Sequence, residues 1–169
     1  IEALDIDSIQ NIEVLEGYTI PTLNEVLDLI QGRIFINIEL KGSQTAIKTN
    51  EILNNYLKNN LWSSDKFLIS SFDWDELKIF RKVNQKVPVA VITEDDPLDA
   101  IPIALELNAV AINPDYKTLN SFNIKKIKEK KLKIYPWTVN EIDDINMMID
   151  FQVDGIITDF PDRIPKPIN

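Results

Sequence analysis

The chain has 169 residues, of which 27 are acidic and 18 basic, and it contains no cysteine and no histidine. This length and a hydrophobic fraction of 44% predict a single globular domain, residues 1–169, with a substantial core. The formal charge of −9 argues against nucleic acid or an anionic membrane surface as the main partner. Without cysteine or histidine, chemistry carried out by this chain must use carboxylates, lysine, tyrosine or hydroxyl groups.

Short segments rich in β-branched residues alternate with amphipathic segments of helical periodicity. The first predicted helix covers residues 22–31 and begins at Thr22, after a proline. Six strands are predicted after it, at residues 34–40, 67–72, 87–93, 109–113, 133–139 and 155–159. The helices between them are predicted at residues 43–60, 73–85, 96–107, 118–131 and 140–152, with N-caps at Ser43, Asp73, Asp96, Thr118 and Asn140. This alternation is typical of βα units that build a parallel sheet.

Two architectures accommodate these strands, an open doubly wound sheet and an incomplete barrel. The four glycines form neither of the common phosphate-binding loops, which removes one support for the doubly wound sheet. The first predicted strand has one apolar face and one face that becomes polar toward its end. The two faces are Ile34, Ile36, Ile38 and Leu40, and Phe35, Asn37, Glu39 and Lys41. This pattern suits a barrel strand, so we predict an α/β fold of the (β/α)8 TIM-barrel type, incomplete, with about six parallel strands and intervening helices.

Glu39 and Lys41 stand two residues apart at the end of the first predicted strand. Their side chains should therefore project to the same side, where the loops of a barrel carry its active site. A carboxylate at this place can hold a divalent cation, and an ammonium group beside it can hold a phosphate. A simple ion pair at the strand end is the alternative interpretation.

Other strand ends offer weaker candidates. Trp137 can form an apolar wall at the mouth of the barrel or serve as a core aromatic. Asp159 can belong to a site or to a turn, whereas Asn140 is more simply explained as a helix cap. Ser70 and Ser71 have no histidine to activate them, which excludes a serine triad within this chain.

Five segments, taken together, resemble the glycerophosphodiester phosphodiesterase family of (β/α)8 barrels. They are residues 20–27 (IPTLNEVL), 36–42 (INIELKG), 70–72 (SSF), 137–140 (WTVN) and 154–162 (DGIITDFPD). They occur in the order found in the family and cover the chain from about residue 20 to 164. Each motif is short, but their common order makes the resemblance specific.

The resemblance implies metal-dependent hydrolysis of glycerophosphodiesters to glycerol 3-phosphate and an alcohol. In the family, carboxylates hold a divalent cation, usually Mg²⁺ or Ca²⁺, and two histidines act as general base and acid. By motif position, Glu39 corresponds to a metal ligand and Lys41 to a catalytic residue that stabilises the phosphate. Trp137 and Phe72 correspond to residues that line the substrate pocket.

The family's His-Arg-Gly, Glu-x-Asp and His-Asp segments precede the segment at residues 20–27, and none of them is found here. We therefore expect the chain to be the C-terminal part of such an enzyme, without its first two strands and inactive alone. The alternative is a non-catalytic partial barrel that acts as a binding or assembly module. We further expect a small-molecule substrate, no nucleic acid partner, no transmembrane segment and, by default, a cytoplasmic location. The headgroup, the choice between glycerophosphodiester and lysophospholipid, the metal and the oligomeric state are left open.

Overall fold

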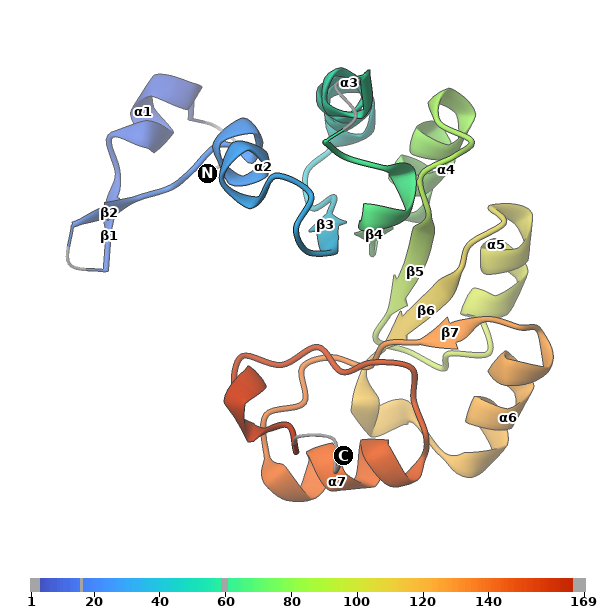
Figure 1. Cartoon of the computed structure of the whole chain (residues 1–169). Coiled ribbons are helices and arrows are strands. Elements are labelled where there is room, and N and C mark those ends of the chain that lie inside the picture. Colours follow the sequence, from blue (N-terminus) through green and yellow to red (C-terminus); the bar gives the residue numbers. More distant parts are fainter. Residues whose placement is uncertain (1–3, 16, 59–60, 166–169) are drawn as a thin grey trace.

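The computed structural model describes residues 4–15, 17–58 and 61–165. A parallel sheet contains β3 (Ile36–Glu39), β4 (Phe67–Ser71), β5 (Val89–Thr93), β6 (Ala111–Pro114) and β7 (Lys133–Ile134), adjacent in chain order. The helices of this region are α3 (Thr45–Lys58), α4 (Trp74–Val83), α5 (Ala100–Glu106), α6 (Ser121–Glu129) and α7 (Ile142–Asp150). Figure 1 shows the sheet curving, with α3 to α6 on its outer side. The fold is that of a partial (β/α) barrel, as predicted.

Four elements precede the sheet in the described part of the chain. They are α1 (Ile6–Gln10), the antiparallel pair β1 (Glu13–Val14) and β2 (Tyr18–Thr19), and α2 (Leu23–Ile30). Figure 1 places α1 and the hairpin beyond α2, away from the parallel sheet. The hairpin was not predicted, because strands of two residues leave no alternation to detect. The predicted start of α2 is confirmed, since Thr22 and Glu25 form a reciprocal capping box.

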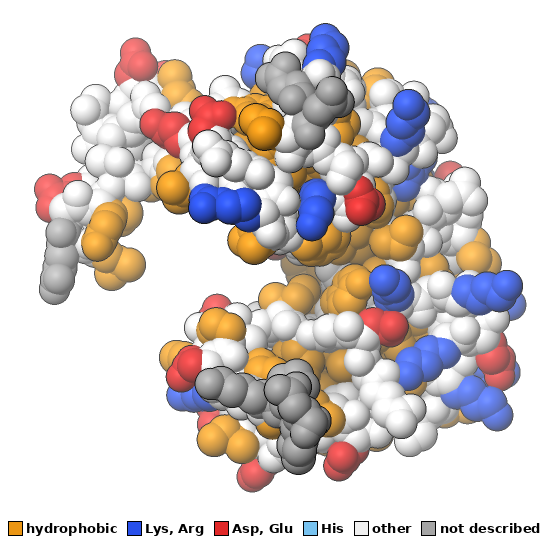
Figure 2. All heavy atoms as spheres, in the orientation of Figure 1, with side chains coloured by type: hydrophobic (Ala, Val, Ile, Leu, Met, Phe, Trp, Pro, Cys, Tyr) orange, Lys and Arg blue, Asp and Glu red, His pale blue; other side chains and the backbone are white. Residues whose placement is uncertain are grey.

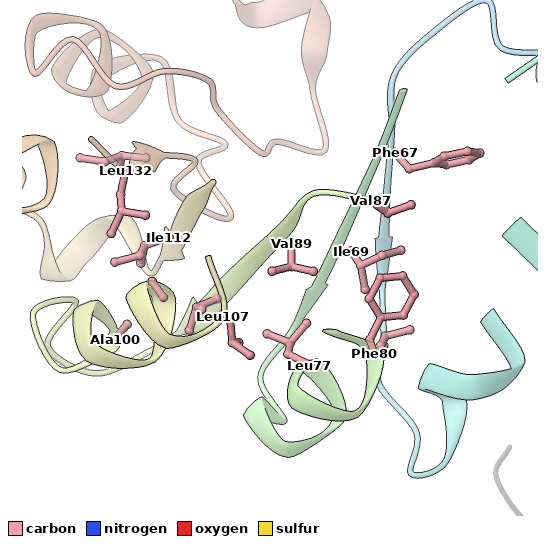
Figure 3. Close-up of a cluster of buried hydrophobic side chains, with 14 of the residues drawn as sticks. Phe67, Ile69, Leu77, Phe80, Val87, Val89, Ala100, Leu107, Ile112 and Leu132 are labelled. Carbon is pink, nitrogen blue, oxygen red and sulfur yellow. The ribbon is translucent and has the colours of Figure 1, made fainter. Parts of the chain in front are cut away.

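The main hydrophobic core lies between the outer face of the sheet and the helices (Figure 3). Ile69, Val89 and Ile112 project from successive strands, and Leu77 and Phe80 meet them from α4. All five side chains are fully buried. Burying each side chain of this kind stabilises the fold by about 1.5–3 kcal/mol relative to exposure, so this layer fixes the helices on the strands.

The inner face of the sheet carries a smaller layer of side chains. Leu68, Ala90 and Ala111 are buried there and pack with the partly buried Tyr135. The register pairs Ala90 with Ala111 on β6 and with Ser70 on β4. Because two of these residues are alanines, the inner side of the sheet is only thinly filled.

The sixth predicted strand, residues 155–159, is not a strand in the structure. Its segment is nevertheless bound to the chain around β7, since Asp154 N–H donates to the carbonyl of Ile134 and Ile157 N–H to that of Pro136. From the first bond to the second, the segment after β7 advances three residues, from Asp154 to Ile157. The segment that accepts these bonds advances two residues, from Ile134 to Pro136. The ladder is therefore out of step, and regular strand pairing does not form. The parallel sheet of the described residues has five strands instead of six.

Of the five N-caps predicted after α2, only Asp73 is confirmed, and the other four are wrong. Asp73 caps α4 by accepting the N–H groups of residues 75 and 76. α5 begins after Asp99 instead of Asp96, and α6 after Asn120, because Thr118 belongs to a 3-10 turn. α3 begins two residues beyond Ser43, and Glu141 precedes α7 in place of Asn140. Within the described ranges, no helix is long and apolar enough to cross a membrane.

Candidate active site at the carboxyl end of the sheet

Strand β3 ends by placing Glu39 and Lys41 on the same side. Leu40, between them, is only 3% exposed and packs in the outer core, so its neighbours point the other way. Lys41 Nζ lies 3.7 Å from Glu39 Oε1. The predicted juxtaposition is confirmed, and it has the geometry of an ion pair. An exposed pair of this kind contributes about 0–1 kcal/mol to stability, so a stabilising role explains little of why the two residues are paired here.

The end of β3 is anchored to the neighbouring strand at Leu40. Leu40 N–H donates to the carbonyl of Ser70 over 2.8 Å, and Ser71 Oγ donates to the carbonyl of Leu40 over 2.6 Å. The same Ser71 hydroxyl accepts the N–H of Asp73 at the start of α4. Both the donor and acceptor capacities of Ser71 are thus used in holding two loops. Its hydroxyl ties the backbone of two βα units together.

Two aromatic side chains predicted to line a pocket meet above the sheet. The rings of Phe72 and Trp137 lie edge to face, with centroids 5.2 Å apart and planes at 82°. Trp137 Nε1–H donates to the carbonyl of Asn113 over 2.8 Å, which fixes the indole. Phe72 is 45% exposed, so its ring offers apolar surface to a ligand. The structure therefore brings the two aromatics together, although they lie 65 residues apart in sequence.

Polar atoms without partners lie on the inner face of the sheet. Ser70 Oγ and both polar atoms of the Asn113 side chain are fully buried and make no hydrogen bond among the described residues. Asn113 also lines a cavity of about 240 Å³, together with Asn37, Leu68 and Tyr135. Figure 2 shows a deep groove on this side of the molecule, with hydrophobic side chains in its walls. Buried polar groups normally have partners, so this inner face is chemically unsatisfied.

The segment that follows β7 is held by Asn140. Its side chain accepts the N–H of Asp159 and donates to Asp159 Oδ2, over 3.0 and 2.9 Å. Arg163 Nη1 donates to the carbonyl of Asn140 over 2.6 Å, and Thr158 Oγ1 donates to its side chain. The helix-cap interpretation of Asn140 is therefore wrong. Asp159 serves this turn contact, one of the two interpretations left open.

Beside this segment, Tyr116 joins the loop after β6 to α7. Its hydroxyl donates to Asp144 Oδ2 over 2.9 Å, and this bond raises the pKa of Tyr116 above its usual value. The backbone N–H of Tyr116 donates to the carbonyl of Trp137 over 3.1 Å. Trp137 is thus held through its ring and through its backbone.

The donor set at the end of β3 fits a divalent cation only in part. Glu39 offers one carboxylate, and Mg²⁺ is commonly held by one or two carboxylates together with water and phosphate oxygens. Among residues 4–15, 17–58 and 61–165 no group of three or more acidic, histidine or cysteine side chains is arranged for a metal. Glu39 can therefore be one ligand, but the described residues do not form a complete protein site.

The sequence analysis missed Glu76, a buried carboxylate in the first turn of α4. A signal was present, because Glu76 stands one turn before Phe80 and thus on the apolar face of the predicted helix 73–85. It also missed Asn113, whose alternation with Ile112 places it on the inner face of β6. The lack of hydrogen-bond partners at Asn113 could not be read from the sequence.

A parallel sheet with helices outside it and polar residues at its carboxyl end defines the (β/α)-barrel class of proteins. The chain matches the model of the glycerophosphoryl diester phosphodiesterase family over residues 2–163, and it belongs to that family.

Curated relatives agree with this assignment. A glycerophosphodiester phosphodiesterase of Caldanaerobacter subterraneus subsp. tengcongensis is 30% identical over 154 residues, which cover 90% of this chain and 63% of the relative. A glycerophosphodiester phosphodiesterase of Bacillus subtilis is 27% identical over 164 residues, covering 89% of this chain and 54% of the relative. The chain therefore spans less than two thirds of the length of these relatives.

Solved structures share the fold. A glycerophosphodiester phosphodiesterase from Parabacteroides distasonis superposes with a TM-score of 0.79 at 24% identity, covering 97% of this chain and 70% of that one. An Oleispira antarctica phosphodiesterase, solved in complex with the product sn-glycerol-3-phosphate, gives a TM-score of 0.75 at 21% identity. That match covers 86% of this chain and 60% of the other.

Proposed function

We propose that this chain takes part in the metal-dependent hydrolysis of glycerophosphodiesters, which yields glycerol 3-phosphate and an alcohol. The observation that carries the proposal is the pairing of Glu39 with Lys41, 3.7 Å apart at the carboxyl end of β3. Membership of the glycerophosphoryl diester phosphodiesterase family supports the reaction class. The glycerol 3-phosphate bound by the Oleispira antarctica phosphodiesterase supports the class of product.

Each side chain has a defined role in this proposal. Glu39 is one ligand of a divalent cation, Mg²⁺ or Ca²⁺, which when bound neutralises phosphate charge. Lys41 holds the phosphate through its ammonium group. Its side chain is 79% exposed, so it can adjust its position to the ligand. Phe72 and Trp137 enclose the glycerol with apolar ring surface.

The roles assigned to this chain are binding and charge stabilisation. It has no histidine, so the imidazole general base and acid that the family resemblance implies are not among its residues. We therefore expect the 169-residue chain alone to hydrolyse glycerophosphocholine no faster than a blank. Metal-dependent turnover by the purified chain would contradict this division of roles.

Binding of glycerol 3-phosphate tests the proposal directly. We expect calorimetric titration in the presence of Mg²⁺ to show binding that weakens about ten-fold or more in Lys41→Gln, because a charge-assisted contact to phosphate is lost. Glu39→Gln should reduce the dependence of this binding on Mg²⁺. Lys125→Gln, a change within the first turns of α6, is the matched control and should leave the affinity unchanged. Equal affinity in wild type and Lys41→Gln would refute the assignment of Lys41.

A non-catalytic assembly module is the second candidate, and the unsatisfied inner face favours it. Ser70 and Asn113 lack partners there, and a further polypeptide segment could supply them. This candidate predicts a stable oligomer and no affinity for glycerol 3-phosphate. Sedimentation velocity together with the titration above separates the two functions.

A further inference from the structure

Glu76 is a buried carboxylate whose partners lie in the neighbouring βα unit. The residue is 5% exposed and stands in the first turn of α4. Glu76 Oε1 accepts the backbone N–H of Gln44 over 2.6 Å, and Oε2 accepts that of Ala46 over 2.8 Å. A buried carboxylate is unfavourable unless its charge is compensated, and here two amides do so. Each oxygen of Glu76 therefore fixes one point of the connection between β3 and α3.

The amides that Glu76 binds belong to the beginning of α3. The first N–H groups of a helix have no partner within the helix, and the helix dipole makes this end positive. Gln44, immediately before the helix, has a φ of +64°, a left-handed conformation that side-chain-bearing residues rarely adopt. Thr45 Oγ1 also donates to the carbonyl of Gly42 over 2.7 Å. The turn is thus held in an unfavourable backbone conformation by a hydrogen bond within it and by the two contacts from Glu76.

Lys41 lies between two residues whose backbone is fixed by hydrogen bonds, one to β4 and the other to α4. On one side, Leu40 is fixed by its hydrogen bonds with the backbone of Ser70 and the hydroxyl of Ser71. On the other side, Gln44 is fixed by Glu76. Three residues, 41–43, connect Leu40 and Gln44, which leaves the backbone of Lys41 little freedom.

We propose that Glu76 is a positioning residue for Lys41, acting by fixing the turn that follows it. This inference rests on the proposed function of Lys41 as the phosphate-binding group. Because Lys41 has a long side chain, the place of its ammonium group beside Glu39 depends on where its backbone is held. Loss of the Glu76 contacts frees the backbone at Gln44, and Lys41 then binds phosphate with more conformational cost.

A simple helix cap makes a different prediction from a positioning residue. A cap stabilises α3, so its loss lowers the unfolding temperature without altering the mobility of Lys41 or ligand affinity. A positioning residue changes both of these. The two roles are therefore separated by measurements on Lys41 itself.

The test compares Glu76→Gln with the wild-type chain by amide NMR and by titration with glycerol 3-phosphate and Mg²⁺. The glutamine keeps the shape of the side chain, but its NH₂ group faces one of the two backbone N–H donors. We expect faster hydrogen exchange at Gln44 and Ala46, a lower heteronuclear NOE at Lys41, and an affinity about five-fold to ten-fold weaker. Glu51→Gln, an exposed change on the same helix α3, is the matched control and should alter none of these.

Each outcome decides between the interpretations. An unchanged NOE at Lys41 in a folded Glu76→Gln protein overturns the inference, whatever the ligand does. If the wild-type chain fails to bind glycerol 3-phosphate, the proposed function fails, while the NMR comparison still decides the role of Glu76. If Glu76→Gln does not fold, Glu76→Asp replaces it. This variant keeps the charge but has a shorter side chain, so an NOE at Lys41 below the wild-type value supports positioning and a wild-type NOE overturns it.

Discussion

The two ends of the same parallel sheet treat their polar groups in opposite ways. At the amino end, Asn84 Oδ1 accepts the N–H groups of Lys86 and Val87, and Asn84 Nδ2 donates to Asn50. Arg81, beside it, donates to the carbonyls of Leu107, Asn84 and Val87. These bonds join the C-terminal end of α4 to α3, to the end of α5 and to the segment that leads into β5.

At the carboxyl end, several side chains are exposed or lack partners, although Ser71 and Trp137 make their hydrogen bonds. Lys41 is 79% exposed, and Phe72 is nearly half exposed. Ser70 Oγ and the side chain of Asn113 are buried without a hydrogen bond among the described residues. One end of the sheet is thus built for stability, and the other keeps chemical groups available, which is the division expected of a barrel.

The largest effect on the free energy of unfolding is expected for a substitution at the amino end of the sheet. Asn84→Ala removes three hydrogen bonds. It leaves the N–H of Val87 buried without a partner and leaves Asn50 Oδ1 with its contact to Asn54 alone. We expect the free energy of unfolding in urea to fall by about 2–3 kcal/mol. Affinity for glycerol 3-phosphate should not change. Asn24→Ala, an exposed change on α2, is the control and should stay within about 0.5 kcal/mol of wild type. A loss of less than about 0.5 kcal/mol in Asn84→Ala would contradict the stabilising role of the amino end of the sheet.

An intermediate effect is expected at the aromatic pair. Phe72→Ala removes the edge-to-face contact with Trp137, which is worth about 0.5–1.5 kcal/mol. We expect a fall in the free energy of unfolding within this range, together with weaker binding of glycerol 3-phosphate. Phe122→Ala, which removes an exposed ring on α6, should leave binding unaltered. Undiminished affinity in Phe72→Ala would remove Phe72 from the site.

The smallest stability effect is expected at the residue proposed to matter most for binding. Lys41→Gln breaks an exposed ion pair with Glu39, so the free energy of unfolding should change by less than about 1 kcal/mol. The same variant should lose most of its affinity for glycerol 3-phosphate. Urea denaturation and titration on one preparation check both values. A large loss of stability would show that Lys41 stabilises the fold, as the polar groups at the amino end of the sheet do.

The alternation within residues 34–41 was sufficient to predict the side on which Glu39 and Lys41 lie. It depends on the two-residue period of a strand, and Leu40 confirms it by its burial. The strand predicted at residues 155–159 did not form, although that segment has the composition of a strand. Its hydrogen bonds to Ile134 and Pro136 are spaced out of step, and a single sequence does not show the spacing of a partner.

Helix starts were likewise predictable where the capping residue is local in sequence, and not where the partner is distant. Thr22 and Asp73 were identified correctly because each caps its helix with its own side chain. At α3, Ser43 was chosen as the local candidate, but the N–H of Ala46 is bound by Glu76, 30 residues away. Phe72 and Trp137 were each assigned to a pocket, but their mutual contact required the fold.

Leu40 has a consequence for how this protein can vary. Its side chain is packed in the outer core, and the groups on either side of it are the carboxylate and the ammonium group proposed to bind the cation and the phosphate. An insertion or deletion of one residue in β3 would turn Leu40 toward the groove and bury a charge among the helices. Substitutions can adjust the site one side chain at a time, but a change of length in this strand would destroy core and site together.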